Sequence, residues 1–151
     1  MAKQTHTSIV ILVADDDAED RMLVNDALEE SRLANMVHFV EDGEELMDYL
    51  RNRGKYVDKA KYPSPGLILL DLNMPRKDGR EAVKEIKADP KLRIIPIVVL
   101  TTSKAEEDII KTYDLGVSSF ITKPVTFSSM VEIMKTLGKY WFEIVELPPK
   151  R

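Results

Sequence analysis

Five short runs of apolar residues alternate with five segments of helical periodicity along this chain. The apolar runs cover residues 9–14, 36–40, 67–70, 95–100 and 117–121. Regular alternation of strands and helices predicts a parallel sheet that is covered by helices on both faces. The third run, LILL, has no polar residue, which is typical of a strand buried on both sides. We therefore expect an α/β fold.

Polar residues also indicate where several helices begin and end. Three expected capping boxes, each with a glutamate three residues later, start at Asp42, Asp78 and Ser103. Thr126 is expected to cap the last helix in the same way. Gly116 predicts a left-handed helix end, because glycine accepts a positive φ at little cost.

Composition limits the protein class. The chain has 151 residues, 44% hydrophobic and 32% charged, which favours one globular domain with a sizeable core. A net charge of -4 argues against a nucleic-acid-binding surface, and the absence of cysteine excludes disulfides and thiolate chemistry. Residues 1–8 lack a signal-peptide core and are expected to be a disordered tail. No apolar run is long enough to span a membrane, so we expect a cytoplasmic protein.

Polar side chains follow four of the five apolar runs, where each predicted strand ends. In chain order these side chains include Asp15, Asp16, Asp71, Thr101 and Lys123. Because the carboxyl ends of parallel strands meet at one edge of a sheet, these groups are expected to share one crevice. Several carboxylates in one pocket repel each other unless a proton or a cation intervenes. Mg²⁺ prefers such oxygen ligands, so the sequence predicts a magnesium site with Asp71 as a phosphoryl-accepting nucleophile.

These side chains belong to four short motifs that stand at the predicted strand ends. The motifs are VADD at 13–16, DLNMP at 71–75 with a following DG at 78–79, LT at 100–101 and FITKP at 120–124. Together they resemble the receiver domain of two-component response regulators, in the same order and over roughly residues 9–138. The resemblance implies a doubly wound (βα)5 flavodoxin-like sheet with strand order 2-1-3-4-5. We expect the receiver domain to span residues 9–147, with no output domain.

The resemblance also implies a role for each matching residue. Asp71 corresponds to the phosphoacceptor, and Asp15 and Asp16 to the acidic pair that holds Mg²⁺. The backbone carbonyl of Asn73 would complete the metal shell, and Lys123 would contact the phosphoryl group.

Two further residues correspond to the switch of this family. Thr101 matches the hydroxyl that turns inward on phosphorylation, and Phe120 matches the aromatic side chain that follows it. Pro124, after Lys123, corresponds to a proline that usually has a cis peptide bond.

The resemblance implies a histidine kinase as phosphoryl donor and a homodimer through the C-terminal face. The apolar residues Tyr140, Trp141 and Phe142 continue beyond the expected end of the last helix, so we interpret them as an interface. The long connection 52–66 and this extended end are similar to single-domain regulators paired with bacterial phytochrome kinases. The connection is interpreted either as functional or as a solvated loop.

Two other functions remain open at this point. A Mg²⁺-dependent phosphatase of the haloacid dehalogenase kind would also use an aspartyl nucleophile, but it needs a second aspartate where this chain has Asn73. A flavodoxin-like cofactor binder would need a phosphate-binding loop after the first strand, where this chain has three aspartates. His6 and His38 do not occur in a pattern that predicts a ligand or a phosphohistidine.

Overall fold

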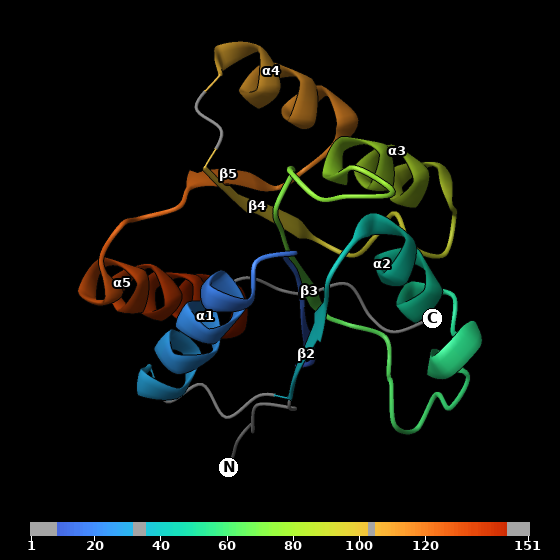
Figure 1. Ribbon diagram of the computed structural model, residues 1–151, viewed down its shortest axis with the longest axis horizontal. Coiled ribbons are helices and arrows are strands. Elements are labelled where there is room, and N and C mark those ends of the chain that lie inside the picture. Colours follow the sequence, from blue (N-terminus) through green and yellow to red (C-terminus); the bar gives the residue numbers. More distant parts are fainter. Residues whose placement is uncertain (1–8, 32–35, 103–104, 145–151) are drawn as a thin grey trace.

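The computed structural model describes residues 9–31, 36–102 and 105–144, which form a five-stranded parallel sheet with flanking helices (Figure 1). In spatial order the strands are β2 (Val37–Val40), β1 (Ile11–Ala14), β3 (Leu67–Leu70), β4 (Ile97–Thr101) and β5 (Ser119–Thr122). The expected doubly wound fold and its strand order 2-1-3-4-5 are confirmed. The expected tail 1–8 and residues 145–147 lie outside the described residues.

Helices cover both faces of the sheet. They are α1 (Ala18–Glu30), α2 (Gly43–Leu50), α3 (Gly79–Ala88), α4 (Glu106–Leu115) and α5 (Phe127–Gly138), with a π-helical continuation at Lys139–Ile144. Helices α1 and α5 lie together on one face, and α2, α3 and α4 lie on the other (Figure 1). None of these described helices is long and apolar enough to cross a membrane.

Strand β3 supplies side chains to two separate hydrophobic cores. Ile68 and Leu70 pack in the core under α2 and α3, whereas Leu67 and Leu69 pack in the core under α1 and α5. This division follows from strand geometry, since successive side chains point to opposite faces. All four residues are buried, which confirms that the wholly apolar run is covered on both sides.

Most of the expected helix caps are present. Asp78 forms a complete capping box with Glu81, and the side chains of Asp42 and Thr126 accept hydrogen bonds from backbone N–H groups at the starts of α2 and α5. The expected cap of α4 is wrong: Ala105 is its N-cap residue, while Ser103 lies outside the described residues. Helix α4 begins at Glu106, the glutamate of the expected capping box. Glu106 therefore follows the observed cap by one residue, whereas a capping box needs a spacing of three.

The long connection 52–66 extends the core rather than running free through solvent. Tyr56 is 6% exposed and packs edge-on against Tyr62, and both rings contact the buried Tyr49 of α2. The side-chain amide of Asn52 donates hydrogen bonds to the carbonyls of Tyr56 and Tyr62 at 2.9 and 3.1 Å. These contacts hold the connection against α2.

Trp141 does not belong to an exposed partner surface, so this part of the expected interface is wrong. Its side chain is 7% exposed and joins the core between α1 and α5. Trp141 follows Met134 and Leu137 on the face that packs in this core, whereas the neighbouring Tyr140 is 49% exposed. The side chain of Phe142 lies outside the described residues.

The two neighbouring aromatic residues should therefore differ in their effect on stability. Trp141→Ala should lower the free energy of unfolding by about 3 to 5 kcal/mol, because it leaves a cavity in the core. Tyr140→Ala should cost about 1 kcal/mol or less, because it loses mainly the ring contact with Trp141. Urea denaturation of both variants measures the difference, and equal losses would contradict the buried position of Trp141.

Candidate functional site

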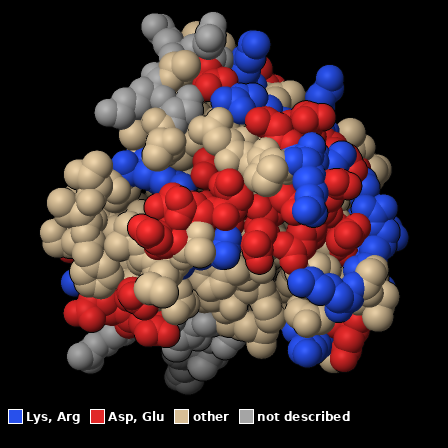
Figure 2. Space-filling view, viewed as in Figure 1, with Lys and Arg blue, Asp and Glu red and all other residues tan. Residues whose placement is uncertain are grey.

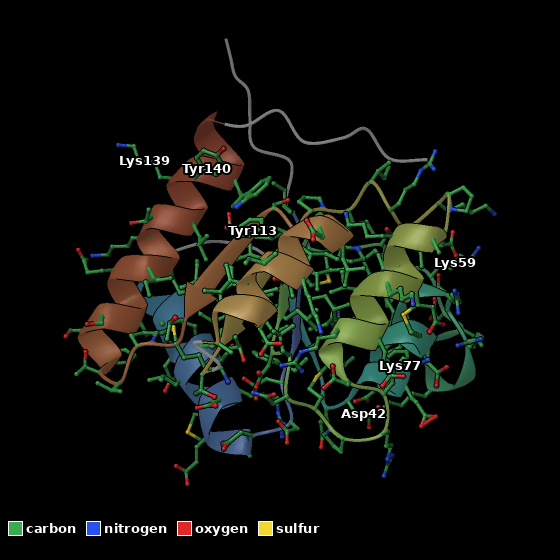
Figure 3. All side chains as sticks on the ribbon, turned by 90° about the horizontal axis from the view of Figure 1, so that it is seen from above. Asp42, Lys59, Lys77, Tyr113, Lys139 and Tyr140 are labelled. Atoms are coloured by element: carbon green, nitrogen blue, oxygen red, sulfur yellow. The ribbon has the colours of Figure 1, made fainter. Side chains whose placement is uncertain are left out.

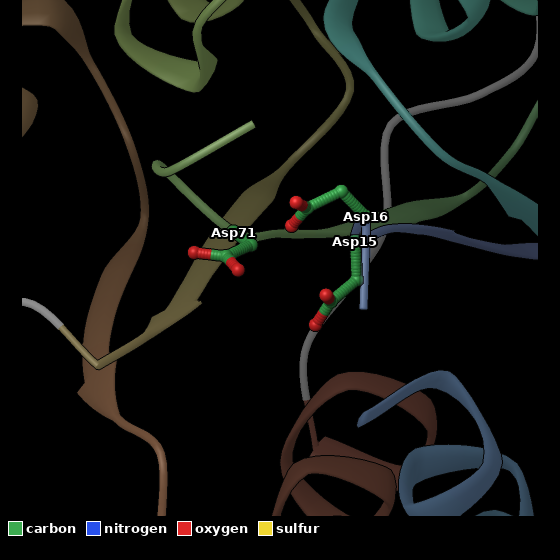
Figure 4. A group of neighbouring side chains, drawn as sticks. All are labelled: Asp15, Asp16 and Asp71. Atoms are coloured by element: carbon green, nitrogen blue, oxygen red, sulfur yellow. The ribbon is translucent and has the colours of Figure 1, made fainter. Parts of the chain in front are cut away.

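The site is built at the carboxyl ends of the neighbouring strands β1 and β3. Ala14 lies opposite Leu70 in the sheet, so the next residues, Asp15 and Asp71, leave adjacent strands at the same level. The backbone N–H of Asp71 donates a hydrogen bond to the carbonyl of Ala14 at 2.9 Å, which fixes this register. Carboxylate oxygens of Asp15, Asp16 and Asp71 all lie within 4.8 Å of one another (Figure 4).

The two oxygens of Asp71 have different partners. Oδ1 accepts hydrogen bonds from the hydroxyl of Thr101 at 2.8 Å and from the backbone N–H of Asn73 at 3.1 Å. Oδ2 accepts one from Nζ of Lys123 at 3.0 Å. Asp71 is 7% exposed and Thr101 is fully buried. The acid is therefore held in a fixed orientation from three directions.

Lys123 is the positive centre of the site. Its Nζ lies 2.7 Å from a carboxylate oxygen of Asp15 and 2.8 Å from one of Asp20, in addition to its contact with Asp71. Burial disfavours the ammonium, but hydrogen bonds to Asp15 and Asp20 outweigh burial and raise the pKa of Lys123. The lysine is therefore charged throughout the physiological pH range.

Negative charge exceeds positive charge in this pocket. Burial raises the pKa of Asp15 above its ordinary value of 3.8, although the hydrogen bond from Lys123 partly opposes this effect. A carboxyl whose pKa is raised by folding binds more protons in the folded state, so its contribution to stability falls as pH rises through that pKa. Figure 2 shows many further Asp and Glu side chains around the starts of α1 and α2. A divalent cation with oxygen ligands would offset the repulsion among Asp15, Asp16 and Asp71.

The loop after β3 packs tightly against the start of α3. A Cβ atom at Gly79 would lie 2.5 Å from the carbonyl oxygen of Asp71 and 2.7 Å from Cα of Leu72. The backbone N–H of Gly79 also donates a hydrogen bond to the carbonyl of Leu72 at 2.9 Å. Only glycine permits this approach, which places the first turn of α3 directly on the backbone of Asp71.

Five of the expected site residues are brought together: Asp15, Asp16, Asp71, Thr101 and Lys123. The side chain of Asn73 is exposed, and a metal-binding role for its carbonyl stays a prediction.

Thr101 already donates a hydrogen bond to Asp71, so the expected inward turn is not needed to bring its hydroxyl into the site. The described residues contain no cis peptide bond, so the bond before Pro124 is trans rather than cis.

Phe120 lies outside the pocket. Its ring is half-buried against the core under α2 and α3. Its backbone N–H donates a hydrogen bond to the hydroxyl of Tyr113 on α4 at 3.1 Å. The expected switch residue thus contacts α4 directly, although it does not contact Asp71.

Sequence reasoning missed Asp20 as a member of the site. An acid at this position is typical of the first turn of a helix. Its backbone N–H does donate a hydrogen bond to the capping carboxylate of Asp17 at 3.1 Å. No sequence pattern distinguishes Asp20 from an ordinary acidic residue in the first turn of α1. Its contact with Lys123 joins residues that are 103 positions apart, so only the fold reveals it.

Comparisons with known proteins agree with this geometry. A family model described as the response regulator receiver domain matches residues 11–135. Response regulator Rcp1 of Synechocystis sp. (strain ATCC 27184 / PCC 6803 / Kazusa) is 38% identical over 148 residues, covering 98% of this chain and 99% of Rcp1. A crystal structure of the phosphorylated cyanobacterial phytochrome response regulator RcpA matches with a TM-score of 0.87 and 43% identity, covering 95% of this chain and 100% of RcpA. The Mn²⁺-bound form of Rcp1 matches with a TM-score of 0.84 and 40% identity, covering 93% of this chain and 99% of that one.

The acidic pocket should bind divalent cations, and binding should stabilise the fold. A cation at one hundred times its Kd should raise the free energy of unfolding by about 2.7 kcal/mol, because it binds only the folded state. Asp16→Asn should largely remove this gain, since it deletes one of the clustered carboxylates. Thermal melts with and without Mg²⁺ or Mn²⁺ measure the effect.

Asp17→Asn is the control, because an exposed asparagine caps α1 equally well. If both variants lose the same amount of cation-dependent stabilisation, the assignment of Asp16 to the cation site is contradicted.

Proposed function

Because the chain belongs to the response regulator receiver domain family and is a phosphorelay response regulator, we propose that it accepts the phosphoryl group of a histidine kinase on Asp71. The observation that carries this proposal is the environment of that carboxylate. Asp71 lies beside two other acids, accepts a hydrogen bond from Thr101 and contacts the ammonium of Lys123. Such a pocket neutralises and positions a phosphoryl group without a general base.

The transfer forms one bond and breaks one. A carboxylate oxygen of Asp71 attacks the phosphorus, and the bond between phosphorus and the kinase histidine breaks with its electron pair left on the imidazole nitrogen. The product is an acyl phosphate, a mixed anhydride of Asp71. Mg²⁺, held by Asp15, Asp16, Asp71 and the carbonyl of Asn73, supplies charge neutralisation when bound.

The remaining residues of the pocket act on the phosphoryl oxygens. Lys123 moves one hydrogen bond from Asp71 to a phosphoryl oxygen, which reduces the negative charge that accumulates there. Thr101 already points into the pocket, and its hydroxyl moves its hydrogen bond from Oδ1 of Asp71 to the new group. The phosphoryl group therefore acquires two donors that previously served the bare carboxylate.

This rearrangement reaches the surface through α4. Arg80, at the start of α3, forms a two-bond ion pair with Asp108 of α4, with both distances at 2.8 Å. At the other end of the helix, Tyr113 accepts the hydrogen bond from Phe120 of β5. We propose that a shift of Thr101 at the end of β4 moves α4, which these two contacts hold near its first and last turns. Side chains on α4 and beside α5 present apolar groups to solvent, including Ile110, Tyr113, Val125 and Phe127.

The partner is a histidine kinase, and we propose one of the bacterial phytochrome kind. The named relatives Rcp1 and RcpA support this choice, since RcpA is a phytochrome response regulator similar to this chain over nearly its whole length. We also propose that the protein acts in the cytoplasm and that it forms a homodimer through its C-terminal face. Because Trp141 is buried, we propose that the contact includes Tyr140, which is exposed in the π-helical turn after α5 (Figure 3).

The protein is proposed to act as a phosphoacceptor with no separate substrate, rather than as a phosphatase. A phosphatase of the haloacid dehalogenase kind needs an aspartate two residues after its nucleophile, and Asn73 stands there. An amide cannot serve as the general acid and base that turnover requires. Steady release of phosphate from a phosphomonoester would favour the enzyme, and a single stoichiometric phosphorylation would favour the receiver.

Phosphorylation should depend on one carboxylate. Asp71→Asn should abolish incorporation of hydroxylamine-sensitive phosphate from acetyl phosphate or a kinase, because an amide cannot form the acyl phosphate. Mass spectrometry of intact protein measures incorporation. The Asp17→Asn variant should be labelled like the wild type, and undiminished labelling of Asp71→Asn would exclude Asp71 as the acceptor.

The proposed dimer should depend on the exposed end of α5. Tyr140→Ser should shift the phosphorylated protein toward the monomer, because it removes an apolar group that is 49% exposed. Light scattering after size-exclusion chromatography measures the mass. Lys139→Ser is the matched control, since it changes a neighbouring exposed side chain without removing an aromatic ring. A wild type that stays monomeric when phosphorylated would overturn the dimer.

A further inference from the structure

Asp20 contacts the site from a different side than the other acids. It lies in the first turn of α1, and its carboxylate is 2.8 Å from Nζ of Lys123, which follows β5. The side chain of Asp20 is 34% exposed, whereas those of Asp15 and Asp71 are 4% and 8% exposed. Asp20 therefore holds the ammonium from the open mouth of the pocket, and the other two acids hold it from the floor.

The hydrogen-bonding capacity of Lys123 is fully used. An ammonium group has three N–H donors, and each lies within hydrogen-bond distance of a different carboxylate, those of Asp15, Asp20 and Asp71. Asp15 and Asp71 also belong to the group of acids that are close enough to share a cation, and Asp20 does not. Of these three partners of Lys123, Asp20 is thus the one whose carboxylate lies outside the candidate cation site.

We infer that Asp20 is a positioning residue. It keeps Lys123 directed at the phosphoacceptor when Asp15 and Asp71 bind the cation and the phosphoryl group. This inference rests on the proposed function, because it assumes that Lys123 moves one hydrogen bond to the phosphoryl group. Lysine has a flexible four-carbon stem, so its ammonium stays in place only when its surroundings hold it. Without Asp20, Lys123 would keep, among the described residues, only acidic partners that belong to the candidate cation site.

A simpler role for Asp20 would be to stabilise the start of α1. Acidic residues in the first helical turn interact favourably with the helix dipole, and Glu19 occupies the same turn. That role does not involve Lys123, so its loss would have the same consequence whether or not the lysine is present. The two roles can therefore be separated by combining substitutions at both positions.

The test measures the rate of phosphorylation from acetyl phosphate at saturating Mg²⁺. Asp20→Ala should slow the reaction by about tenfold, the lower end of the effect seen when a supporting residue is lost. Asp20→Asn should restore part of the rate, because an amide oxygen still accepts the hydrogen bond from Lys123. Glu19→Ala, the matched control in the same exposed turn, should react like the wild type. In a Lys123→Met background, Asp20→Ala should cause no further loss.

A second readout does not depend on the reaction. In the metal-free protein, the ¹H–¹⁵N signal of the Lys123 ammonium should be visible, because hydrogen-bonded protons exchange slowly with water. Asp20→Ala should weaken or remove this signal, and Glu19→Ala should leave it unchanged.

Three results would overturn the inference: Asp20→Ala reacting as fast as the wild type, an equal loss with and without Lys123, or an unchanged ammonium signal. If the wild type itself takes up no phosphate, the proposed function fails instead. The ammonium signal then still decides whether Asp20 holds Lys123.

Discussion

The confinement of several carboxylates around one buried lysine is the constraint on which this site depends. Asp15, Asp20 and Asp71 all contact Lys123, and Asp16 lies close to two of them. Repulsion among the acids favours binding of cations, and the ammonium of Lys123 offsets part of that repulsion. Under the proposed function, the same arrangement prepares the pocket for a cation and a phosphoryl group. Repulsion among the carboxylates would therefore both lower the stability of the metal-free protein and favour the binding of a cation.

The fold tolerates this cost because the sheet beneath the pocket is buried on both faces. Residues of β3 alternate between two hydrophobic cores, so the strand that ends in Asp71 is held from both sides. Gly79 then allows the first turn of α3 to pack against the backbone of Asp71. A rigid support of this kind holds the side chains of the pocket at fixed distances from one another.

Under the proposed function, helix α4 would carry a change in the pocket to the surface. It is held by the ion pair between Arg80 and Asp108 at its first turn and by the hydrogen bond between Tyr113 and Phe120 at its last. Both contacts lie at the surface of the helix rather than in a core, so modest energy separates alternative positions. These two polar contacts join α4 to the start of α3 and to β5.

The sequence by itself determined the fold class, the approximate positions of the five strands and five of the residues that meet in the pocket. It could do so because apolar runs define strands, and parallel strands bring their carboxyl ends to one edge. The roles of Asp20 and Trp141 were decided only by tertiary structure. Asp20 meets Lys123 across 103 positions, and Trp141 packs in the core between α1 and α5 together with Met134 and Leu137. Local patterns record which residues are polar or apolar, but the partner of a side chain depends on elements that are distant in the chain.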